Sequence, residues 1–287
     1  MTARTALVTD STSNLSHDLA EKRHIHIAPL YVLWGDKSYK DGVDISEAEL
    51  FQKLRELGSD DDLPKTSQVS VQDFVDMFKQ AREAENADEV VCTVISTGMS
   101  GTYSSAMQAR EQVDFPVHVI DSLYTSWALG LPVLSGADAR DQGASPTEIV
   151  EAIQQSLAHT SFHFTLESLD FLHRGGRIGN ASHLFGTLLN IKPVLKMVDG
   201  VVTSADKVRT RKRALQRLMA LAAKDVGDHK VKRVAVMHGG TEGEARPVLD
   251  QAVAKFQPQE HFFNFATSVL GVHVGPGAVG LIVEWLD

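Results

Sequence analysis

The sequence predicts an α/β protein with two domains: an N-terminal α/β domain built on a parallel sheet, and a second, mixed α/β domain. Two features of the chain lead to this prediction. Short apolar runs alternate with helical patterns up to about residue 160, an order typical of a parallel sheet with helices on both faces. After that point a hairpin pattern and further strands break the regular alternation. We therefore expect one domain over residues 1–160 and the other over residues 161–287.

Apolar runs of strand length mark the sheet of the first domain, and helical patterns separate them. The run at 24–34 is long enough for one or two strands. The expected strands are 5–10, 24–34, 89–96 and 117–122. The expected helices begin near residue 16, cover 47–57 and 71–84, begin at residue 100, and cover 126–139 and 145–159.

Serines mark the beginnings of three of these helices, because a serine hydroxyl can accept a hydrogen bond from a free N–H group of the first turn. Ser46 begins a capping-box pattern and Ser70 can cap the next helix. Ser145 is followed by Pro146 at the first helical position and Glu148 at the third. These starts support the helix assignments.

The second domain is expected to mix a hairpin with single strands. The hairpin covers 194–208 and turns at Asp199-Gly200, a dipeptide that favours tight turns. An irregular segment at 174–182 precedes it. The other expected elements are strands at 162–168, 232–238, 261–266 and 279–286, a long helix at 209–224, and a helix from about residue 241.

Composition and charge limit the class of protein. The net charge of −9 makes the whole molecule a poor candidate for nucleic-acid binding. The single cysteine, Cys92, lies in an apolar run and is expected to be a buried core thiol. The first residues lack an apolar stretch of signal-peptide length, and no run approaches the ~18 apolar residues of a membrane span. We expect a cytoplasmic protein with no stable membrane insertion.

Hydroxyl-rich turns next to strands are the main candidate for a binding site. The carboxyl ends of parallel strands meet at one edge of a sheet, where helix N-termini also present free N–H groups. Such an arrangement suits a small anion. Helix capping alone is the alternative for any single turn, but several polar residues per turn exceed what capping needs. The hydroxyls that we single out are those of Thr66, Ser67, Ser96 and Ser100.

Motifs of several enzyme classes are absent from the sequence. It contains no G-x-S-x-G, no Walker A sequence and no H-E-x-x-H. The match to G-x-G-x-x-G at 275–280 precedes a strand rather than a helix, so we interpret it as backbone that glycine brings close to another group. His24 and His26 share a strand face but lack a third ligand, so no metal site is expected. Asp10 and Asp121 are explained by capping.

Basic residues cluster in the second domain despite the negative net charge. A solvated helix face explains some of them. Arg177 and Arg209 border polar turns instead, so they could dock an acidic partner or nucleotide phosphates. The cluster consists of Arg174, Arg177, Lys192, Lys196, Lys207, Arg209, Arg211, Lys212, Arg213 and Arg217.

An ordered series of sequence blocks from about residue 5 to 280 resembles the DegV family. The resemblance implies two α/β domains with a long-chain fatty acid, such as palmitate or oleate, held between them. It implies the non-catalytic fatty-acid-binding subunit of bacterial fatty acid kinase, which needs no cofactor and presents the acyl carboxylate to a separate ATP-dependent kinase subunit. The blocks are TALVTDSTSNLS, IAPLYV, KTSQVSVQDF, STGMSGTYSSA, VIDS, LDFLHRGGRIGNASHLFGTLLNIKPVL, DGVVTSADKVRTRKRAL and GVHVGPGAVG.

The resemblance also implies roles for single residues. Thr66 and Ser100 match the family's carboxylate-binding hydroxyls, and His273 matches the histidine near the carboxylate. Arg177 and Arg209 are similar to residues used in working with the kinase. The chain departs from the family at Val69 and Thr97, where proline and serine are common, but neither change removes a matched hydroxyl.

Some assignments stay open. Ser96 belongs either to the carboxylate site or to a strand cap. A stand-alone enzyme acting on a small carboxylate or phosphorylated substrate, with His273 as general base, is one alternative function, and a regulatory module that binds through its basic face is another. Apolar side chains after the G-G-R block could line an acyl tunnel or pack in the core; they are Leu184, Phe185, Leu188, Leu189 and Ile191.

Overall fold

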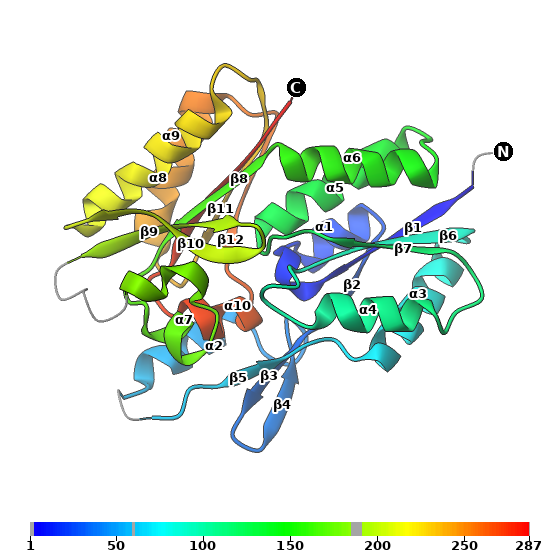
Figure 1. Cartoon of the computed structure of the whole chain (residues 1–287), viewed down its shortest axis with the longest axis horizontal. Helices are drawn as coiled ribbons and strands as arrows, with labels where there is room; N and C mark the ends of the chain where they lie inside the picture. Colours follow the sequence, from blue (N-terminus) through cyan, green and yellow to red (C-terminus); the bar gives the residue numbers. More distant parts are fainter. Residues whose placement is uncertain (1–2, 59–60, 185–190, 287) are drawn as a thin grey trace.

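The computed structural model describes residues 3–58, 61–184 and 191–286. Its N-terminal part contains a four-stranded sheet in the order β2-β1-β6-β7 (Figure 1). All neighbouring strands of this sheet run parallel, so the expected parallel sheet is confirmed. The strands are β1 (Thr5–Asp10), β2 (Ile25–Ala28), β6 (Glu89–Val94) and β7 (Val117–Asp121).

Helices cover both faces of the parallel sheet, with α3 and α4 on one side and α5 and α6 on the other (Figure 1). Ser70 and Ser145 form full capping boxes, and Ser46 accepts the expected N–H bond. The helix expected from residue 100 begins two residues later, and its N-cap is Gly101. The helices are α1 (His17–Lys22), α2 (Glu47–Glu56), α3 (Val71–Ala84), α4 (Thr102–Arg110), α5 (Trp127–Asp141) and α6 (Pro146–Ala158).

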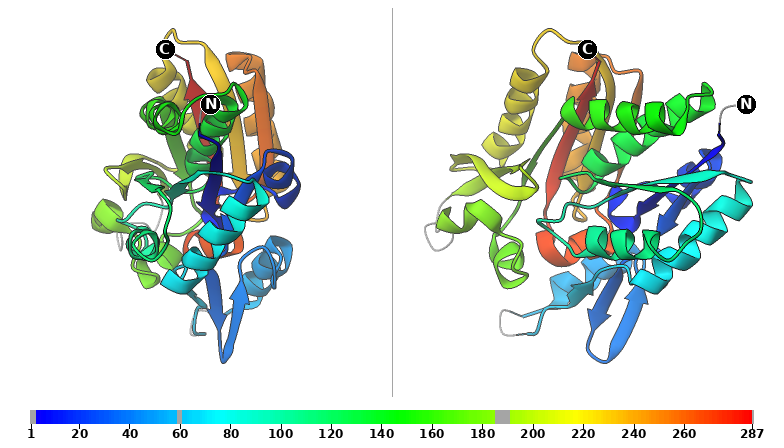
Figure 2. Two further views of the ribbon diagram at one scale, coloured as in Figure 1. Left: turned by 90° about the vertical axis from the view of Figure 1, so that its right-hand side faces the viewer. Right: turned by 45° about the vertical axis from the view of Figure 1, so that its right-hand side comes forward.

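The second sheet has six strands in the order β10-β9-β8-β13-β11-β12. Only β11 and β12 pair in parallel, so this is the expected mixed sheet. Helices α8 and α9 lie together on its outer face, while α5 contacts its other face (Figures 1 and 2). Its elements are β8 (Thr160–Thr165), β9 (Lys192–Val198), β10 (Val201–Val208), α8 (Arg211–Val226), β11 (Val231–His238), α9 (Glu242–Phe256), β12 (Glu260–Phe265) and β13 (Val279–Trp285).

A small third sheet and two short helices were not expected. The sheet has the order β4-β3-β5 and projects away from the rest of the molecule (Figure 2). Helix α10 packs against α2, β3 and β5, so a segment near the end of the chain lies beside residues 31–67. These contacts cross the expected domain boundary near residue 160, and that boundary remains a prediction. The expected run 24–34 forms two strands, β2 and β3 (Tyr31–Trp34). The elements that were not expected are β4 (Lys37–Lys40), β5 (Lys65–Ser67), α7 (Asp170–Arg174) and α10 (Ser268–Val274), with 3-10 turns at Ser11–Ser13 and Gly179–Leu184.

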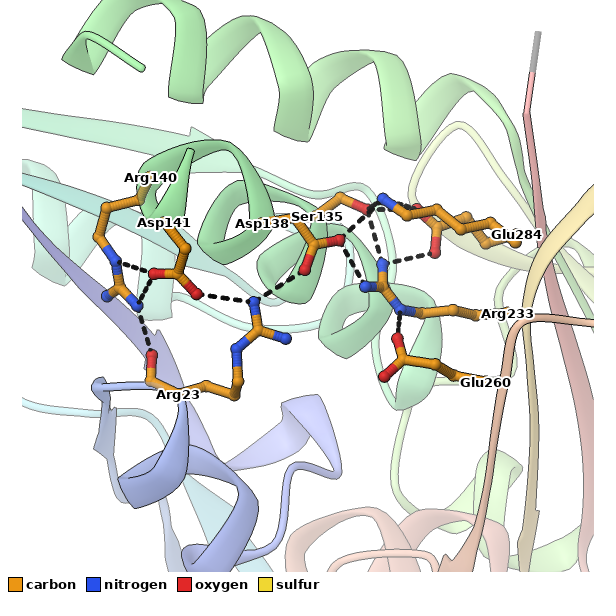
Figure 3. Close-up of polar contacts among 9 residues, drawn as sticks. Arg23, Ser135, Asp138, Arg140, Asp141, Arg233, Glu260 and Glu284 are labelled. Carbon is orange, nitrogen blue, oxygen red and sulfur yellow. Dashed lines mark hydrogen bonds and ion pairs between the residues drawn. The ribbon is translucent and has the colours of Figure 1, made fainter. Parts of the chain in front are cut away.

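A network of ion pairs joins α5 to the mixed sheet (Figure 3). Arg233 of β11 is only 2% exposed and contacts Asp138 at 2.5 Å, Glu260 at 2.6 Å and Glu284 at 3.2 Å. Burial alone would raise the pKa of Asp138, but the charge of Arg233 and several hydrogen bonds outweigh it and lower that pKa to about 2. We call Arg233, Asp138, Glu260 and Glu284 the charge network. It fixes α5 against the mixed sheet.

Candidate ligand-binding site

A cavity of about 230 Å³ lies among the parallel sheet, the mixed sheet and α10. We call it the inner cavity. No aspartate or glutamate is found among its described lining residues, which combine many apolar side chains with a few hydroxyls and one cation, as is typical of a ligand-binding pocket. The apolar residues include Phe162, Phe164, Met197, Val202 and Met237, and the polar ones include Thr66, Gln68, Ser100, Arg177 and His273.

Thr66 and His273 meet in the wall of the inner cavity although 207 positions separate them. Thr66 Oγ1 lies 2.8 Å from Nε2 of His273. Burial, aided by the charge of Arg177, lowers the pKa of His273 to about 4. The imidazole is therefore neutral at pH 7. Its Nδ1 has no hydrogen-bond partner among the described residues and lies against Gly175, where a side chain would collide with it.

Helix α10 is held in place by a buried carboxyl that the sequence did not reveal. Asp41 accepts hydrogen bonds from the backbone N–H of Val269 at 3.3 Å and from the hydroxyl of Ser11 at 2.8 Å. Burial raises the pKa of Asp41 to about 7. Because Val269 lies in the first turn of α10, this contact helps to orient the helix that carries His273.

The two serines of the turn after β6, Ser96 and Ser100, lie in different settings. Ser100 lines the inner cavity, and its hydroxyl lies 2.9 Å from that of Thr102. The hydroxyl of Ser96 instead donates to the carbonyl of Gly200 at 2.7 Å and accepts from the N–H of Gly98 at 3.0 Å. Ser96 does not line the inner cavity, so its contacts do not support the carboxylate-binding role that the sequence left open for it. It joins this turn to the tip of the β9–β10 hairpin.

The two arginines expected at a partner surface lie in different settings. Arg177 is part of the inner cavity wall and donates from Nε to the carbonyl of Met99 at 3.2 Å and from Nη1 to that of Gly175 at 2.7 Å. Arg209 is exposed at the beginning of the α8 region and makes no hydrogen bond or ion pair with the described residues. Only Arg177 is thus close to Thr66 and His273.

The apolar residues after the G-G-R block that could have lined an acyl tunnel do not line the inner cavity where the structure describes them. Leu184 is buried and Ile191 is half-buried, but neither lines the inner cavity. Phe185, Leu188 and Leu189 lie outside the described residues. Part of the observed apolar wall comes from strands of the mixed sheet, and the spacing of Phe162 and Phe164 along β8 is the sequence signal that could have indicated it.

The remaining candidates have structural roles. Gly275 has φ of 68° and lies where a side chain would collide with Phe171. This agrees with the expectation that glycine at 275–280 brings the backbone close to another group. His24 and His26 both contact Glu85, and the described residues hold no group of three metal-ligating side chains. Cys92 is buried, as expected. Within the described ranges, no helix has both the length and the apolar character to cross a membrane.

The fold and the site together define an α/β protein with two large sheets, one small sheet and an amphipathic cavity. The chain belongs to the DegV family: residues 4–285 match the model of an uncharacterised protein family of that name. A DegV domain-containing protein of Deinococcus radiodurans is 37% identical over 289 residues, which cover 98% of this chain and 99% of the relative.

Solved structures of fatty-acid-binding proteins share this fold. A fatty-acid-binding DegV family protein from Thermus thermophilus superposes with a TM-score of 0.92 at 33% identity and covers 99% of this chain and 100% of its own. A stearic acid-binding protein from Eubacterium ventriosum superposes with a TM-score of 0.86 at 28% identity, covering 98% of both chains. The expected family and fold are thereby confirmed.

Proposed function

We propose that this protein binds one long-chain fatty acid in the inner cavity and presents its carboxylate to a separate ATP-dependent kinase subunit, which forms the acyl phosphate. One observation carries the proposal: Thr66, Ser100, Arg177 and His273 gather in a largely apolar cavity whose described lining has no acidic side chain. The fatty acid bound by the Thermus and Eubacterium relatives supports the choice of ligand.

The carboxylate would be held by hydroxyl donors and one cation. Neutral His273 can donate from Nε2 to Thr66, which leaves the hydroxyl proton of Thr66 free for the ligand. Ser100 supplies a second hydroxyl, and Arg177 supplies positive charge in the same wall. The site thus stabilises an anion without a group that would remove or add a proton.

The acyl chain would lie against the aromatic and methionine side chains of the mixed sheet. Each buried methylene contributes about 0.8 kcal/mol, so a sixteen-carbon chain gains roughly 10 kcal/mol before the cost of ordering it. Met197 and Met237 are unbranched and flexible, which lets them adapt to bends in the chain. Palmitate and oleate are therefore both reasonable ligands.

A stand-alone enzyme finds less support. A histidine with a pKa of about 4 is a weak general base at neutral pH. No described carboxylate lines the inner cavity to orient or assist it. Phosphoryl transfer by the chain alone would also need metal-binding carboxylates beside the site, and the described residues form no such group.

Native mass spectrometry of gently purified protein tests lipid binding. We expect a mass addition of one fatty acid, identified after extraction by gas chromatography, and recovery of this addition when palmitate is given to delipidated protein. Ser100→Ala should weaken palmitate binding, while Ser104→Ala, on the exposed side of α4, should not. A delipidated protein that rejects both palmitate and oleate would refute the proposal.

Mixing with a kinase subunit tests the second half of the proposal. Acyl phosphate should form only when the protein, the kinase subunit, ATP and fatty acid are all present. Turnover of ATP or of an acyl substrate by the purified chain alone would support the stand-alone enzyme instead.

A further inference from the structure

A second cavity, of about 380 Å³, adjoins the inner cavity and shares three residues with it: Thr66, Arg177 and His273. We call it the outer cavity. Its remaining described wall comes from residues 62–65, from the end of α7, where Arg174 and Gly175 lie, and from Val272 of α10. A carboxylate bound to Thr66 would therefore lie in the wall between a largely apolar chamber and a second chamber that holds more charged side chains.

The outer cavity carries two guanidinium groups without acidic partners. Arg174 donates from Nη2 to the carbonyl of Asp61 at 2.5 Å, and Arg177 donates only to carbonyls. Neither arginine lies within ion-pair distance of a described carboxylate. Asp62, which is exposed, is the one acidic residue among the described residues of the wall.

Lys65 is a third cation in the outer cavity wall, but its side chain does not point toward Thr66 and His273. It neighbours Thr66 on β5, and successive side chains of a strand point to opposite faces. Since Thr66 faces His273, the side chain of Lys65 points away from the carboxylate site. Lys65 is nevertheless part of the outer cavity wall. Arg174 and Arg177 are the guanidinium groups of that wall, and guanidinium suits the geometry of phosphate oxygens.

We propose that the outer cavity is a phosphoryl-binding site, in which Arg174 and Arg177 hold the phosphate that becomes attached to the bound fatty acid. This inference rests on the proposed function. An oxygen of the carboxylate would form a bond to the terminal phosphorus of a nucleoside triphosphate carried by the kinase subunit. The bond from that phosphorus to the bridging oxygen would break, and the nucleoside diphosphate would leave with the bond's electron pair. The arginines stay with the transferred group and so retain the acyl phosphate.

Calorimetric titration of delipidated protein with two ligands tests this site. The first ligand is palmitate, and the second is the phosphonate analogue of palmitoyl phosphate in which a CH₂ group replaces the bridging oxygen. We expect wild-type protein to bind both. Arg174→Ala should weaken binding of the phosphonate about tenfold, more at low than at high salt, and leave palmitate binding within about twofold. Arg174→Lys should retain part of the phosphonate affinity.

Arg213→Ala is the matched control, because Arg213 is an exposed arginine on α8 that lines neither cavity. It should change neither affinity. The proposal is overturned if wild-type protein binds palmitate but excludes the phosphonate, or if Arg174→Ala weakens both ligands equally or neither. Failure of wild-type protein to bind palmitate would instead refute the proposed function.

Discussion

The charge network and the proposed carboxylate site, formed by Thr66, Ser100, Arg177 and His273, are both polar and partly buried, yet their polar groups are partnered very differently. Arg233 contacts three carboxylates, and Glu284 also accepts from two serines. In the carboxylate site, Arg177 has only carbonyl partners, and Nδ1 of His273 has none among the described residues. The network satisfies its charges internally, whereas the site leaves donors and positive charge unmatched.

This difference separates groups that hold the fold from groups that can hold a ligand. A buried charge without its partner costs free energy, so a structural ion pair must be complete in the folded chain. A binding site for an anion must instead keep some of its donors for the ligand. Variants of the network should therefore change stability, and variants of the site should change affinity.

The largest expected effect is on the network. Arg233→Ala leaves the buried Glu284 and the half-buried Asp138 without their main cation, so the free energy of unfolding should fall by about 3–5 kcal/mol. Urea denaturation followed by circular dichroism measures this change. Arg246→Ala, which removes an exposed arginine paired with Glu242, is the control and should cost less than about 1 kcal/mol. Equal losses in the two variants would contradict the distinction.

The second prediction concerns pH and His273. The folded-state pKa of about 4 lies below the unfolded value of 6.5, so the unfolded chain takes up a proton first as the pH falls. Stability should be lost between about pH 6.5 and pH 4, by about 3 kcal/mol in total. Comparison with His273→Gln isolates this contribution from that of Asp41 and other groups. A variant whose stability has the same pH dependence as the wild type would argue against a buried neutral imidazole.

Thr66→Val should act mainly on ligand affinity. The change keeps the shape of the side chain but removes the hydroxyl that lies 2.8 Å from His273, so palmitate should bind about tenfold more weakly or worse. Titration calorimetry with palmitate measures the effect. Thr147→Val, at an exposed position of α6, is the matched control. If Thr66→Val destabilised the fold as much as Arg233→Ala and left affinity unchanged, the site would be structural.

The smallest expected effect is at Ser96. Ser96→Ala removes the bond to the carbonyl of Gly200 and should cost about 1 kcal/mol, measured by urea denaturation. Hydrogen exchange at the amide of Gly98 should become faster, because that N–H loses its acceptor. Unaltered exchange at Gly98 would mean that the backbone contacts alone hold the hairpin tip.

The sequence predicted local features more fully than distant contacts. The caps at Ser70 and Ser145 depend on neighbouring residues and were correct. The three-residue strand β5 pairs only with β3, and its place becomes clear only when α10 packs on both. The role of Ser96 stayed open in the sequence, because its hydroxyl bonds to the distant Gly200.

The carboxylate site shows the same limit. Thr66, Ser100 and His273 were expected from family resemblance, and the structure brings all three to one cavity. The position of Arg177 in the cavity wall was not expected, because it depends on carbonyls of two turns that the chain brings together only on folding. Spacing along the chain carries no information about such contacts.

The place of β13 in the mixed sheet bears on how the protein is made. Among the described strands β13 comes last in the chain, yet it lies between β8 and β11 and is the link between the two halves of their sheet. A nascent chain on the ribosome cannot join those halves before residues 279–285 have been synthesised and have left the exit tunnel. His273 lies just ahead of this strand. The inner cavity is lined from both β8 and β11, so its wall is complete only after β13 has paired with both strands.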